Sequence, residues 1–294
     1  MTIVASGTLA MSAINTELGV AATTMRSLND ATSRTLAGIA SGAISFSNFY
    51  GKSNGFVFNQ TISANTANYN LKAAAIAAGW NQTVKLIATV TINAGVYVYA
   101  TDGNTAFSTG VTFPATSTLA VINNGTILGY GGHNTSYLDI NYEPQYDGTN
   151  GTAGGPAMLF QYATAVTNNG RIAGGGGGGG GGGSVILFNW NSGLGGAGGN
   201  GVGMGGSNSL TSPTAGQGQS GGGNDGETVC YGGQGGNGGS YGAAGAAGGQ
   251  AISNGYSIES LTYAGSGGAG GIATNTRAST GSTITGGTIN GSNT

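Results

Sequence analysis

The side chains best suited to chemistry in this chain are carboxylates in its second half. Asp139, Glu143 and Asp147 recur every fourth residue, and a glycosidase needs a pair of carboxylates to cleave a sugar chain. Carboxylate oxygens also bind Ca²⁺, but the spacing of a calcium-binding loop is absent. Because three acids without a further motif are a weak catalytic signal, a glycan depolymerase is an alternative here and not the first expectation.

Other catalytic and metal-binding sites lack the residues that they need. His133 is the single histidine and Cys230 the single cysteine, which excludes a histidine-based triad, an intrachain disulfide and a His- or Cys-rich metal site. The glycine runs lack the Lys-Ser/Thr of a phosphate loop and the context of a dinucleotide fingerprint. We therefore expect no enzyme activity, no cofactor and no bound metal.

Aromatic residues in the same part of the chain favour binding instead. Tyrosine, tryptophan and asparagine give a large contact area for little lost side-chain entropy, which is why they are common in adaptable binding surfaces. The candidate receptor-binding residues are Tyr137, Tyr142, Tyr146, Phe188, Asn189, Trp190, Tyr231, Tyr256 and Tyr263. The alternative for any one aromatic is that it only stabilises the loop that carries it.

The charge balance narrows the classes of partner. Charged residues make up 5% of the 294 residues, and the net charge is −2. Nucleic-acid binding needs a basic face, so we do not expect it. No apolar run is long enough to span a membrane, and the N-terminus lacks the charged and apolar segments of a signal peptide.

Glycine dominates the C-terminal part of the chain. Of the 64 glycines, 45 lie in residues 174–294, and residues 174–183 are all glycine. Glycine also recurs at every third position from 233 to 248, as well as at 195, 198 and 201 and at 265, 268 and 271. Polyglycine II has three residues per turn, and its backbone groups must pair with helices that lie close by. We therefore predict a glycine-rich bundle of polyglycine II helices.

The spacing of the glycines predicts segments that alternate in direction. Outward segments are 129–132, 174–183, 221–223 and 242–249, and returning segments are 148–155, 193–206, 232–239 and 265–271. The loops at the far end are then 133–147, 184–192, 224–231 and 250–264, and Ser240-Tyr241 is one of the connections at the near end. All the acidic residues after Gly132 and all the candidate binding residues fall in the far-end loops.

Residues 1–53 are expected to form a small helical module. Ser12 can cap a short helix that ends at Gly19, and Asn29 or Asp30 can cap a second helix that ends at Gly38. Residues 45–50 can add one more turn. Fifty residues bury little apolar surface, so we expect this module to lean on a partner or on copies of itself.

Residues 54–128 predict a mixed α+β or β-rich domain. A helix is expected from Asn65 or Thr66 to Ala78, capped by Gly79, and strands are expected near 56–62, 84–92 and 95–100, with a turn at Asp102-Gly103. The expected apolar face of that helix consists of Tyr69, Ala73, Ile76, Ala77 and Trp80. The tryptophan is expected in a core.

Two segments of the chain repeat. Residues 120–129 match residues 165–174 at an offset of 45, and residues 252–258 form a weaker third copy. Each copy has a short β run, an Asn-Gly pair and a second β run. Asparagine and glycine tolerate positive φ angles, so a turn is expected at each pair.

The N-terminal motifs resemble a known module. Residues 11–19, 27–30, 36–45 and 49–52 are similar to the N-terminal module of many phage tail and baseplate proteins. The resemblance implies that this end attaches to the virion.

A second resemblance covers residues 120–275. The motifs at 127–132, 151–155 and 168–174 resemble those of the distal tail-fibre adhesins of T-even-type phages. The resemblance implies polyglycine II rods whose variable tip loops bind outer-membrane proteins of the host. Those adhesins sit on a separate fibre, whereas this chain starts with a baseplate-like module. A short fibre in itself is therefore an alternative, and a monomer and a homotrimer are both open.

We therefore expect a mixed fold in three parts. These are an attachment module (1–53), an α+β shoulder (54–128) and a glycine-rich receptor-binding domain (129–294). The expected function is host attachment by a phage tail fibre adhesin at the tail fibre or baseplate periphery. Its partners would be tail or baseplate proteins and a host receptor, either an outer-membrane protein or a glycan. One alternative is a purely structural tail component; another is an ice-binding protein, whose flat, regular face the mixed outward positions do not favour.

Overall fold

The structure is a computed structural model that forms two compact units. It describes residues 3–101, 103–133, 150–183, 185–187, 192–193, 202–203, 223–224, 229–231, 234–250, 252–254, 258–261, 274–275 and 281–291, and of the short strands between 185 and 275 it describes the backbone. Unit 1 contains Met1–Asn59, Ala75–Ala88 and Thr112–Leu119. Unit 2 contains Gln60–Ala74, Thr89–Val111 and Ala120–Thr294. No helix in the described part is long and apolar enough to cross a membrane.

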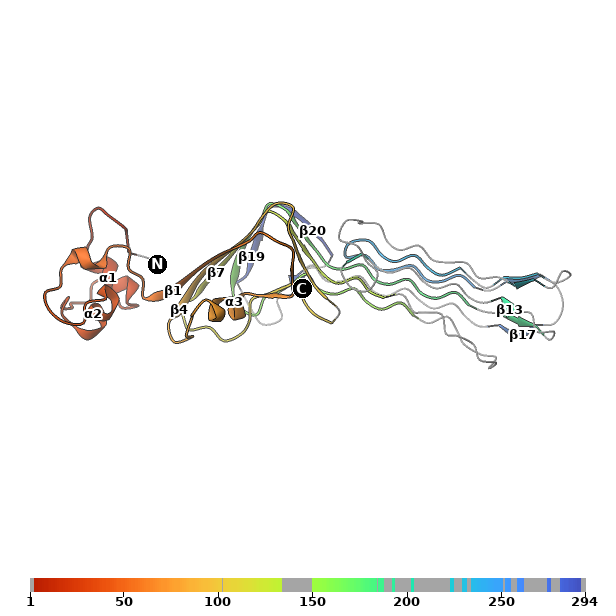
Figure 1. Ribbon diagram of the computed structural model, residues 1–294, viewed down its shortest axis with the longest axis horizontal. Helices are drawn as coiled ribbons and strands as arrows, with labels where there is room; N and C mark the ends of the chain where they lie inside the picture. Colours follow the sequence, from red (N-terminus) through yellow and green to blue (C-terminus); the bar gives the residue numbers. More distant parts are fainter. Residues whose placement is uncertain are drawn as a thin grey trace. The chain divides into compact units, whose positions relative to one another are not determined.

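Unit 1 begins with three short helices, α1 (Met11–Glu17), α2 (Ala31–Ala37) and the 3₁₀ helix η1 (Phe46–Phe49) (Figure 1). The predicted cap of α2 is confirmed, because the Asp30 carboxylate accepts a hydrogen bond from Ser33 N and Gly38 ends the helix at φ 72°. The predicted cap of α1 is wrong. That helix follows Ala10 and has no side-chain cap; its buried Ile14 anchors it instead.

A buried ion pair ties these helices to the β part of unit 1. Glu17 Oε1 lies 3.3 Å from Lys85 Nζ and accepts hydrogen bonds from Asn54 N and Ser53 Oγ. Ile3, Ile14, Leu36, Ala37 and Phe49 form a small apolar core. The helical module is therefore stabilised by contacts with the β part of its own unit. The sequence analysis had expected this support from a partner protein or from further copies of the module.

The helix predicted from residue 65 to residue 78 is largely wrong. The chain instead forms β2 (Thr66–Ala67), β3 (Tyr69–Asn70) and the short helix α3 (Leu71–Ala77). The predicted apolar face is not the buried one, since Ala73, Ile76 and Ala77 are exposed while Leu71 and Ala75 are buried. The strands prevail because Tyr69 pairs with Phe107 in a sheet.

Trp80 is buried, as predicted. Its ring stacks on Phe113 with centroids 5.6 Å apart, and its Nε1 donates to Val84 O. Gly79, just before it, has φ 102° and ends α3, as predicted. Together these residues fix the return of the chain from α3 into the next strand.

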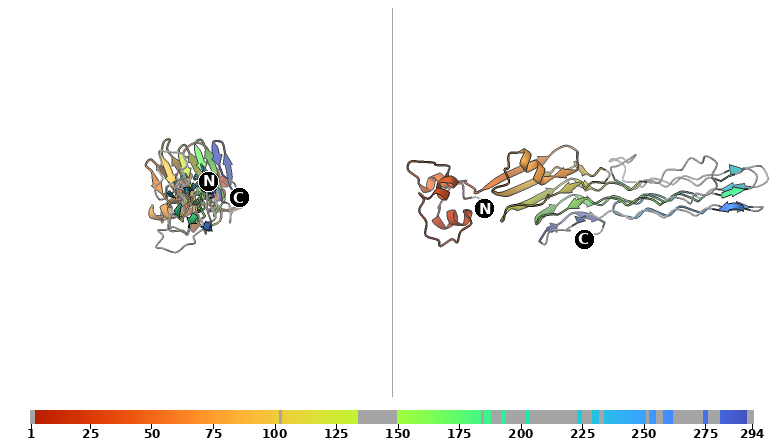
Figure 2. Two further views of the ribbon diagram at one scale, coloured as in Figure 1. Left: turned by 90° about the vertical axis from the view of Figure 1, so that its right-hand side faces the viewer. Right: turned by 90° about the horizontal axis from the view of Figure 1, so that it is seen from below.

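The described β part forms a three-sided solenoid, in which each turn of the chain contributes one strand to each of three sheets. The first sheet has the order β1-β4-β7-β10-β19, the second β2-β5-β8-β11-β20 and the third β18-β9-β6-β3. Successive stretches of chain add one strand to each sheet, and the pairs in the second and third sheets are parallel. The mixed α/β class is therefore correct, with few helices and several parallel sheets (Figure 2).

The strand bounds not yet given are as follows. In the first sheet they are β1 Gly55–Ile62, β4 Lys85–Ile92, β7 Thr118–Asn123, β10 Thr164–Asn168 and β19 Thr283–Thr285. In the second they are β5 Tyr97–Tyr99, β8 Thr126–Leu128, β11 Arg171–Ala173 and β20 Thr288–Asn290. In the third they are β6 Phe107–Ser108, β9 Met158–Leu159 and β18 Thr274–Asn275.

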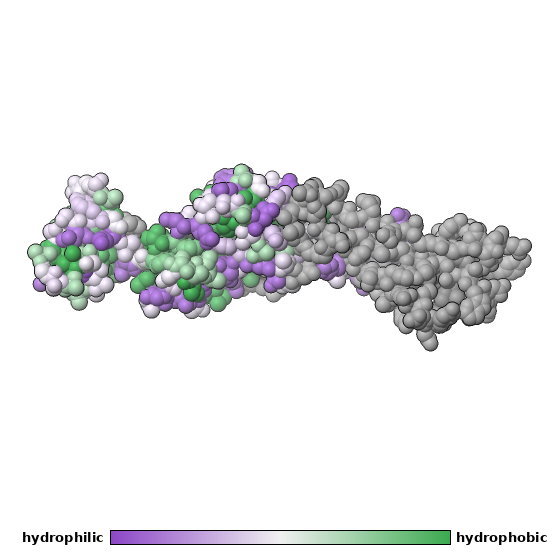
Figure 3. Space-filling model, viewed as in Figure 1, coloured by the Kyte–Doolittle hydropathy of each residue, from purple (hydrophilic) through white to green (hydrophobic). Residues whose placement is uncertain are grey.

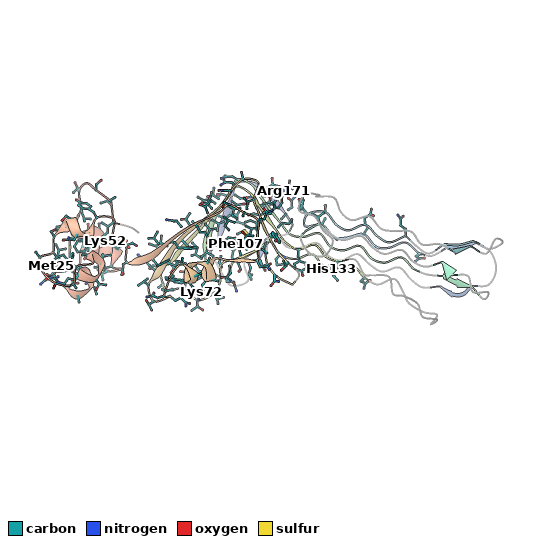
Figure 4. All side chains as sticks on the ribbon, viewed as in Figure 1. Met25, Lys52, Lys72, Phe107, His133 and Arg171 are labelled. Atoms are coloured by element: carbon teal, nitrogen blue, oxygen red, sulfur yellow. The ribbon has the colours of Figure 1, made fainter. Side chains whose placement is uncertain are left out.

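The solenoid core is built from stacked apolar residues. Val98, Ile127 and Ile172 occupy the same register position on neighbouring strands of the second sheet, and each is fully buried. Phe107, labelled in Figure 4, and Met158 do the same in the third sheet. Alternate residues of β4 and β10 also face the inside, which is the period-two pattern of a strand with one buried face.

The repeat at an offset of 45 is a repeat in space, but its Asn-Gly pairs are not hairpin turns. Each pair is the corner where the chain passes from the first sheet to the second. Buried Asn123 donates from Nδ2 to Asn168 Oδ1 at 2.7 Å, and Asn168 Nδ2 points to the carbonyls of Gly286 and Thr288. Positive φ is not what these glycines provide. Gly170 is needed because a Cβ there would lie 2.0 Å from Gly125 O.

The third copy of the repeat is wrongly placed by the sequence. Of these residues, Ile252–Asn254 and Ile258 are described, and they belong to antiparallel strands outside the solenoid. The further corners lie at Asn93 and at Thr285 to Gly287, where the same pattern of strand, corner and strand recurs with less sequence identity. These copies escape notice because the corner requires a polar side chain and small residues, not a fixed sequence.

The glycine-rich segments are two insertions into the solenoid. The first separates β8 from β9, and the second separates β11 from β18. Segment 174–183, called here the central segment, is buried along its whole length. Its backbone bonds to neighbouring segments instead of to itself, so glycine is required where those backbones meet.

The predicted alternation of direction is confirmed for the described segments. Gly175 and Gly178 donate to the carbonyls of Gly155 and Thr152, so that segment runs antiparallel to the central one. Gly177, Gly180 and Gly183 donate to Ala243, Ala246 and Gly249, so segment 243–249 runs parallel to it. Segment 234–239 runs back, and the predicted near-end turn is present, since Ala243 N donates to Ser240 O.

Candidate functional site

The glycine-rich segments lead into two small antiparallel sheets. One has the order β13-β12-β17 and the other β14-β15-β16 (Figures 1 and 2). The strands are β12 Val185–Leu187, β13 Ser192–Gly193, β14 Gly223–Asn224, β15 Val229–Tyr231, β16 Ile252–Asn254 and β17 Ile258–Leu261.

The C-terminal ends of β12 and β16 lie on the same side of the two small sheets, away from the glycine-rich segments. β12 follows the central segment and β16 follows segment 243–249, which runs in the same direction. In the first small sheet Leu187 is opposite Ile258, and in the second Val229 is opposite Asn254. β13 contacts β14 and β15, and β12 contacts β15, so the two sheets adjoin. We call this set of six strands the strand cap.

Most of the sequence-predicted binding residues lie outside the described residues. These are Tyr137, Tyr142, Tyr146, Phe188, Asn189, Trp190, Tyr256 and Tyr263. In the sequence, residues 188–190 follow β12 directly and Tyr256 stands between β16 and β17. Tyr231 is in β15, where its backbone is opposite Ile252. The strand cap thus brings together the strands that flank three of the four predicted far-end loops.

The acidic residues predicted for the far end are also outside the described side chains. Asp139, Glu143, Asp147, Asp225 and Glu227 lie outside the described residues, and Glu259 is in β17, of which the backbone is described. Cys230 lies in the middle of β15, opposite Gly223 and Ser253. In the described part of the chain, no group of three His, Cys, Asp or Glu residues could hold a metal ion.

Two titratable groups have shifted pKa values, and both have structural causes. The Arg26 guanidinium, at 3.0 Å, holds the pKa of the Asp30 carboxyl well below its usual range, with further help from Ser33 and Thr32. Burial raises the pKa of the Tyr69 hydroxyl, which donates to Gln60 Oε1 at 2.6 Å. Asp30 caps a helix and Tyr69 packs on Phe107, so neither marks a reaction centre.

A family model matches the greater part of this chain. The model describes the phage tail fibre adhesin Gp38, and it matches residues 57–294. The chain belongs to the phage tail fibre adhesin Gp38 family. It is therefore a receptor-binding adhesin, and its place is the tail fibre of the virion. The match includes the solenoid, both insertions and the strand cap.

This chain is also similar to a solved structure. It is similar to the crystal structure of the gp37-gp38 adhesin tip complex of the bacteriophage S16 long tail fiber, at 22% identity and a TM-score of 0.46. The similarity covers 98% of this chain and 99% of that one. No curated protein matches the chain.

Sequence reasoning missed two contacts: the hydrogen bond between Asn123 and Asn168 at neighbouring corners, and the contact of Arg171 with Tyr241. The guanidinium carbon of Arg171 lies 4.8 Å from the centre of the Tyr241 ring. The repeat at an offset of 45 pointed to the asparagines, but it did not reveal that Asn123 and Asn168 are buried and bonded to each other. The Arg171 contact has no local signal, since 70 residues of sequence separate the partners.

Proposed function

We propose that this adhesin binds a host-cell receptor through the loops that leave the strand cap. The observation that carries the proposal is the common direction of β12 and β16. Because of this common direction, β12 ends at Leu187 and β16 ends at Asn254 on the same side of the strand cap. In the sequence, these ends lead into residues 188–191 and 255–257. Phe188, Asn189, Trp190 and Tyr256 are the residues in those stretches that fit a binding surface. The receptor is an outer-membrane protein or a surface glycan.

We assign the remaining loops to the same surface as secondary contacts. Residues 134–149 carry Tyr137, Tyr142 and Tyr146, and Tyr231 and Tyr263 lie next to the other loops in sequence. The acidic residues of these loops would meet cationic groups on the receptor, or a cation bridging the two surfaces. The adhesin acts by binding alone, without catalysis and without a cofactor.

The glycine-rich segments form a polyglycine II bundle in this proposal. The support is the pattern of hydrogen bonds along the central segment, in which every third backbone amide bonds to the same neighbouring segment. Amides 175 and 178 bond to segment 150–155, amides 177, 180 and 183 bond to segment 243–249, and amide 176 bonds to Val202. Three residues per turn give each neighbour every third amide. A bundle whose segments are joined by backbone hydrogen bonds in this way holds the strand cap rigid.

The three predicted domains acquire roles under this proposal. Residues 1–53 attach the adhesin to another protein of the tail fibre or baseplate. Residues 54–128 are the shoulder, and residues 129–294 contain the receptor-binding domain. The second range also includes strands β9, β10, β11 and β18 to β20, which belong to the solenoid. The adhesin assembles as a monomer or as a homotrimer, which a mass measurement on the purified protein would decide.

Apolar surface on the helical part supports the attachment role. Met25 is 98% exposed, and Val4 and Phe46 are 50% and 40% exposed. Figure 3 shows apolar area on this part of unit 1, and Figure 4 labels Met25 there. Exposed apolar side chains of this size are costly in water, and they become favourable when a partner covers them.

The tip assignment is tested by adsorption of whole particles. A phage whose adhesin carries Phe188→Ser and Trp190→Ser should assemble normally and lose most of its adsorption, because two aromatic anchors are gone. Replacement of residues 250–264 should do the same. Val111→Ser, a change at an exposed apolar residue of the solenoid part, is the control. Normal adsorption after both tip changes would overturn the assignment, and release of sugar from host capsule would favour a depolymerase.

A further inference from the structure

An open polar groove lies at the corner between the first and second sheets of the solenoid. It has a volume of about 310 Å³ and is lined by residues of consecutive solenoid turns. Its main lining residues are Asn124, Gly125, Thr126, Gly170, Arg171 and Thr288. All of them belong to unit 2, and none lies in the strand cap. The groove is therefore separate from the proposed receptor-binding loops.

The backbone of the corner creates the groove. A Cβ at Gly125 would lie 2.3 Å from Val96 O, and one at Gly170 would lie 2.0 Å from Gly125 O, so only glycine fits at both positions. The residues after the corner glycines are Thr126, Arg171 and Thr288. They occupy the same register position on the neighbouring strands β8, β11 and β20. Neighbouring strands lie about 4.8 Å apart, so the groove presents one polar side chain at each such step.

Arg171 brings a positive charge to the groove, and no carboxylate side chain that the structure describes belongs to its unit. The carboxylate side chains that the structure describes are Glu17 and Asp30, and both belong to unit 1. Within the described residues the Arg171 guanidinium, labelled in Figure 4, donates no hydrogen bond. Its central carbon lies 4.8 Å from the centre of the Tyr241 ring. Such stacking fixes the plane of the guanidinium and leaves its N–H groups to bind a carboxylate or a phosphate.

The neighbours of Arg171 offer further hydrogen-bonding groups. The hydroxyls of Thr126 and Thr288 make no hydrogen bond to the residues that the structure describes. Asn124 Oδ1 accepts from Asn169 Nδ2 at 2.9 Å, and that leaves the Asn124 amide N–H groups for a ligand. All these side chains are partly or fully exposed. A row of hydroxyl and amide groups around one cation matches a ligand with many hydroxyls and one negative charge.

We propose that this corner groove binds an acidic oligosaccharide of the bacterial surface. Arg171 pairs with the carboxylate or phosphate of one sugar, while Asn124, Thr126 and Thr288 bond to hydroxyls along the chain. A free phosphate ion would use Arg171 alone and leave the row of neutral groups unused. An extended saccharide uses the whole groove, because its polar groups repeat along its length as the solenoid turns do. This contact would add to the one at the tip.

The test is isothermal titration of the full-length adhesin with two probes. The first is the phosphorylated core oligosaccharide of lipopolysaccharide from the propagating host, and the second is trigalacturonate, whose charges are carboxylates. Binding of the first alone identifies a phosphate ligand and binding of the second alone a carboxylate ligand; either outcome supports the proposal. Removal of phosphate from the first probe should abolish its binding. Failure of both probes to bind would overturn the proposal.

Variants assign the binding to the groove. Arg171→Leu should weaken binding on the order of tenfold or more, since it removes a charge-assisted hydrogen bond. Thr126→Val with Thr288→Val keeps the Arg171 contact with Tyr241 and should weaken binding several-fold. Thr283→Val, on the first sheet and outside the groove, is the matched control. Unchanged binding by both groove variants, with unchanged melting temperature, would overturn the proposal.

The tip variant separates this proposal from the proposed function. An adhesin with Phe188→Ser and Trp190→Ser should bind the oligosaccharide as the parent does. If that variant also lost oligosaccharide binding, the saccharide would bind at the tip and the groove assignment would be wrong. If adsorption proved independent of the tip, binding in the groove would still stand on its own titration.

Discussion

Asp30 shows how one carboxylate organises the helical part of unit 1. It caps α2 through Ser33 N at 2.7 Å and pairs with Arg26 in a two-point contact. Both contacts are stronger with the ionised carboxylate, which is why the pKa of Asp30 is lowered, chiefly by Arg26. The sequence predicted the cap from the type and place of the residue, but it did not predict the pairing with Arg26, which a local turn from Ser27 to Asp30 brings about.

Asp30→Ala should destabilise unit 1 by about 1 kcal/mol, the usual value of a lost N-cap. Asp30→Asn should cost less, since an amide oxygen can still cap. The lowered pKa means that the stabilisation is present above the unfolded pKa near 3.8 and is lost as the pH falls below it. Thermal unfolding at pH 7 and pH 3 measures this. An equal effect of Asp30→Ala at both pH values would contradict it.

Asn168 is the residue on which two corners of the solenoid depend. Its Oδ1 accepts from Asn123, and its Nδ2 faces the carbonyls of Gly286 and Thr288. Asn168→Ala should lower stability by about 2 kcal/mol, because it leaves buried polar groups without their partner. Asn169→Ala, an exposed neighbour bonded to Asn124, should cost less than about 0.5 kcal/mol. Chemical denaturation of the two variants side by side measures the difference.

The solenoid sheets and the glycine-rich segments depend on different features of the sequence. The strands need alternating apolar residues, while the segments need positions without side chains. Glycines 236, 239, 245 and 248 belong to the predicted series of every third residue, and a Cβ at each would lie 2.1 Å from a carbonyl oxygen of a neighbouring segment. The period was therefore informative about packing, although the partners of each segment were decided by the fold.

Gly179→Ala tests the close packing of the segments. A Cβ at residue 179 would lie 1.9 Å from Gly236 O, so the two backbones must move apart. We expect a loss of several kcal/mol, more than ordinary overpacking of a core. Ala244→Ser changes an exposed position of the same bundle and should be nearly neutral. If Gly179→Ala melted at the parent temperature, the segments would not be packed as described.

At the scale of the whole molecule, the attachment role proposed for residues 1–53 can be tested separately from receptor binding. Residues 1–53 lie outside the family match, which begins at residue 57. An adhesin with Met25→Asp and Phe46→Asp should fold and bind host cells, yet fail to join the particle, since a charge would enter the apolar contact. The fraction of adhesin recovered with purified particles measures this. Normal incorporation would contradict the attachment role, and Thr35→Asp is a control at an exposed polar position of the same module.

The sequence by itself determined the class of the molecule. Composition argued against nucleic-acid binding and catalysis, the glycine period indicated backbone packing, and the repeated Asn-Asn-Gly marked positions of equal structure. These are local or periodic signals, and each follows from what one residue type can do: glycine lets backbones meet, and asparagine bonds to backbone at a corner.

The tertiary structure decided which segments meet. Tyr69 lies in a strand and not in a helix because it pairs with Phe107. Strands β16 and β17 lie outside the solenoid because their partners are β15 and β12. The two insertions enter the solenoid between its second and third sheets, and the polar groove forms where Thr126, Arg171 and Thr288 come into register. Contacts between residues far apart in sequence have no local period, so the chain reveals them only once it is folded.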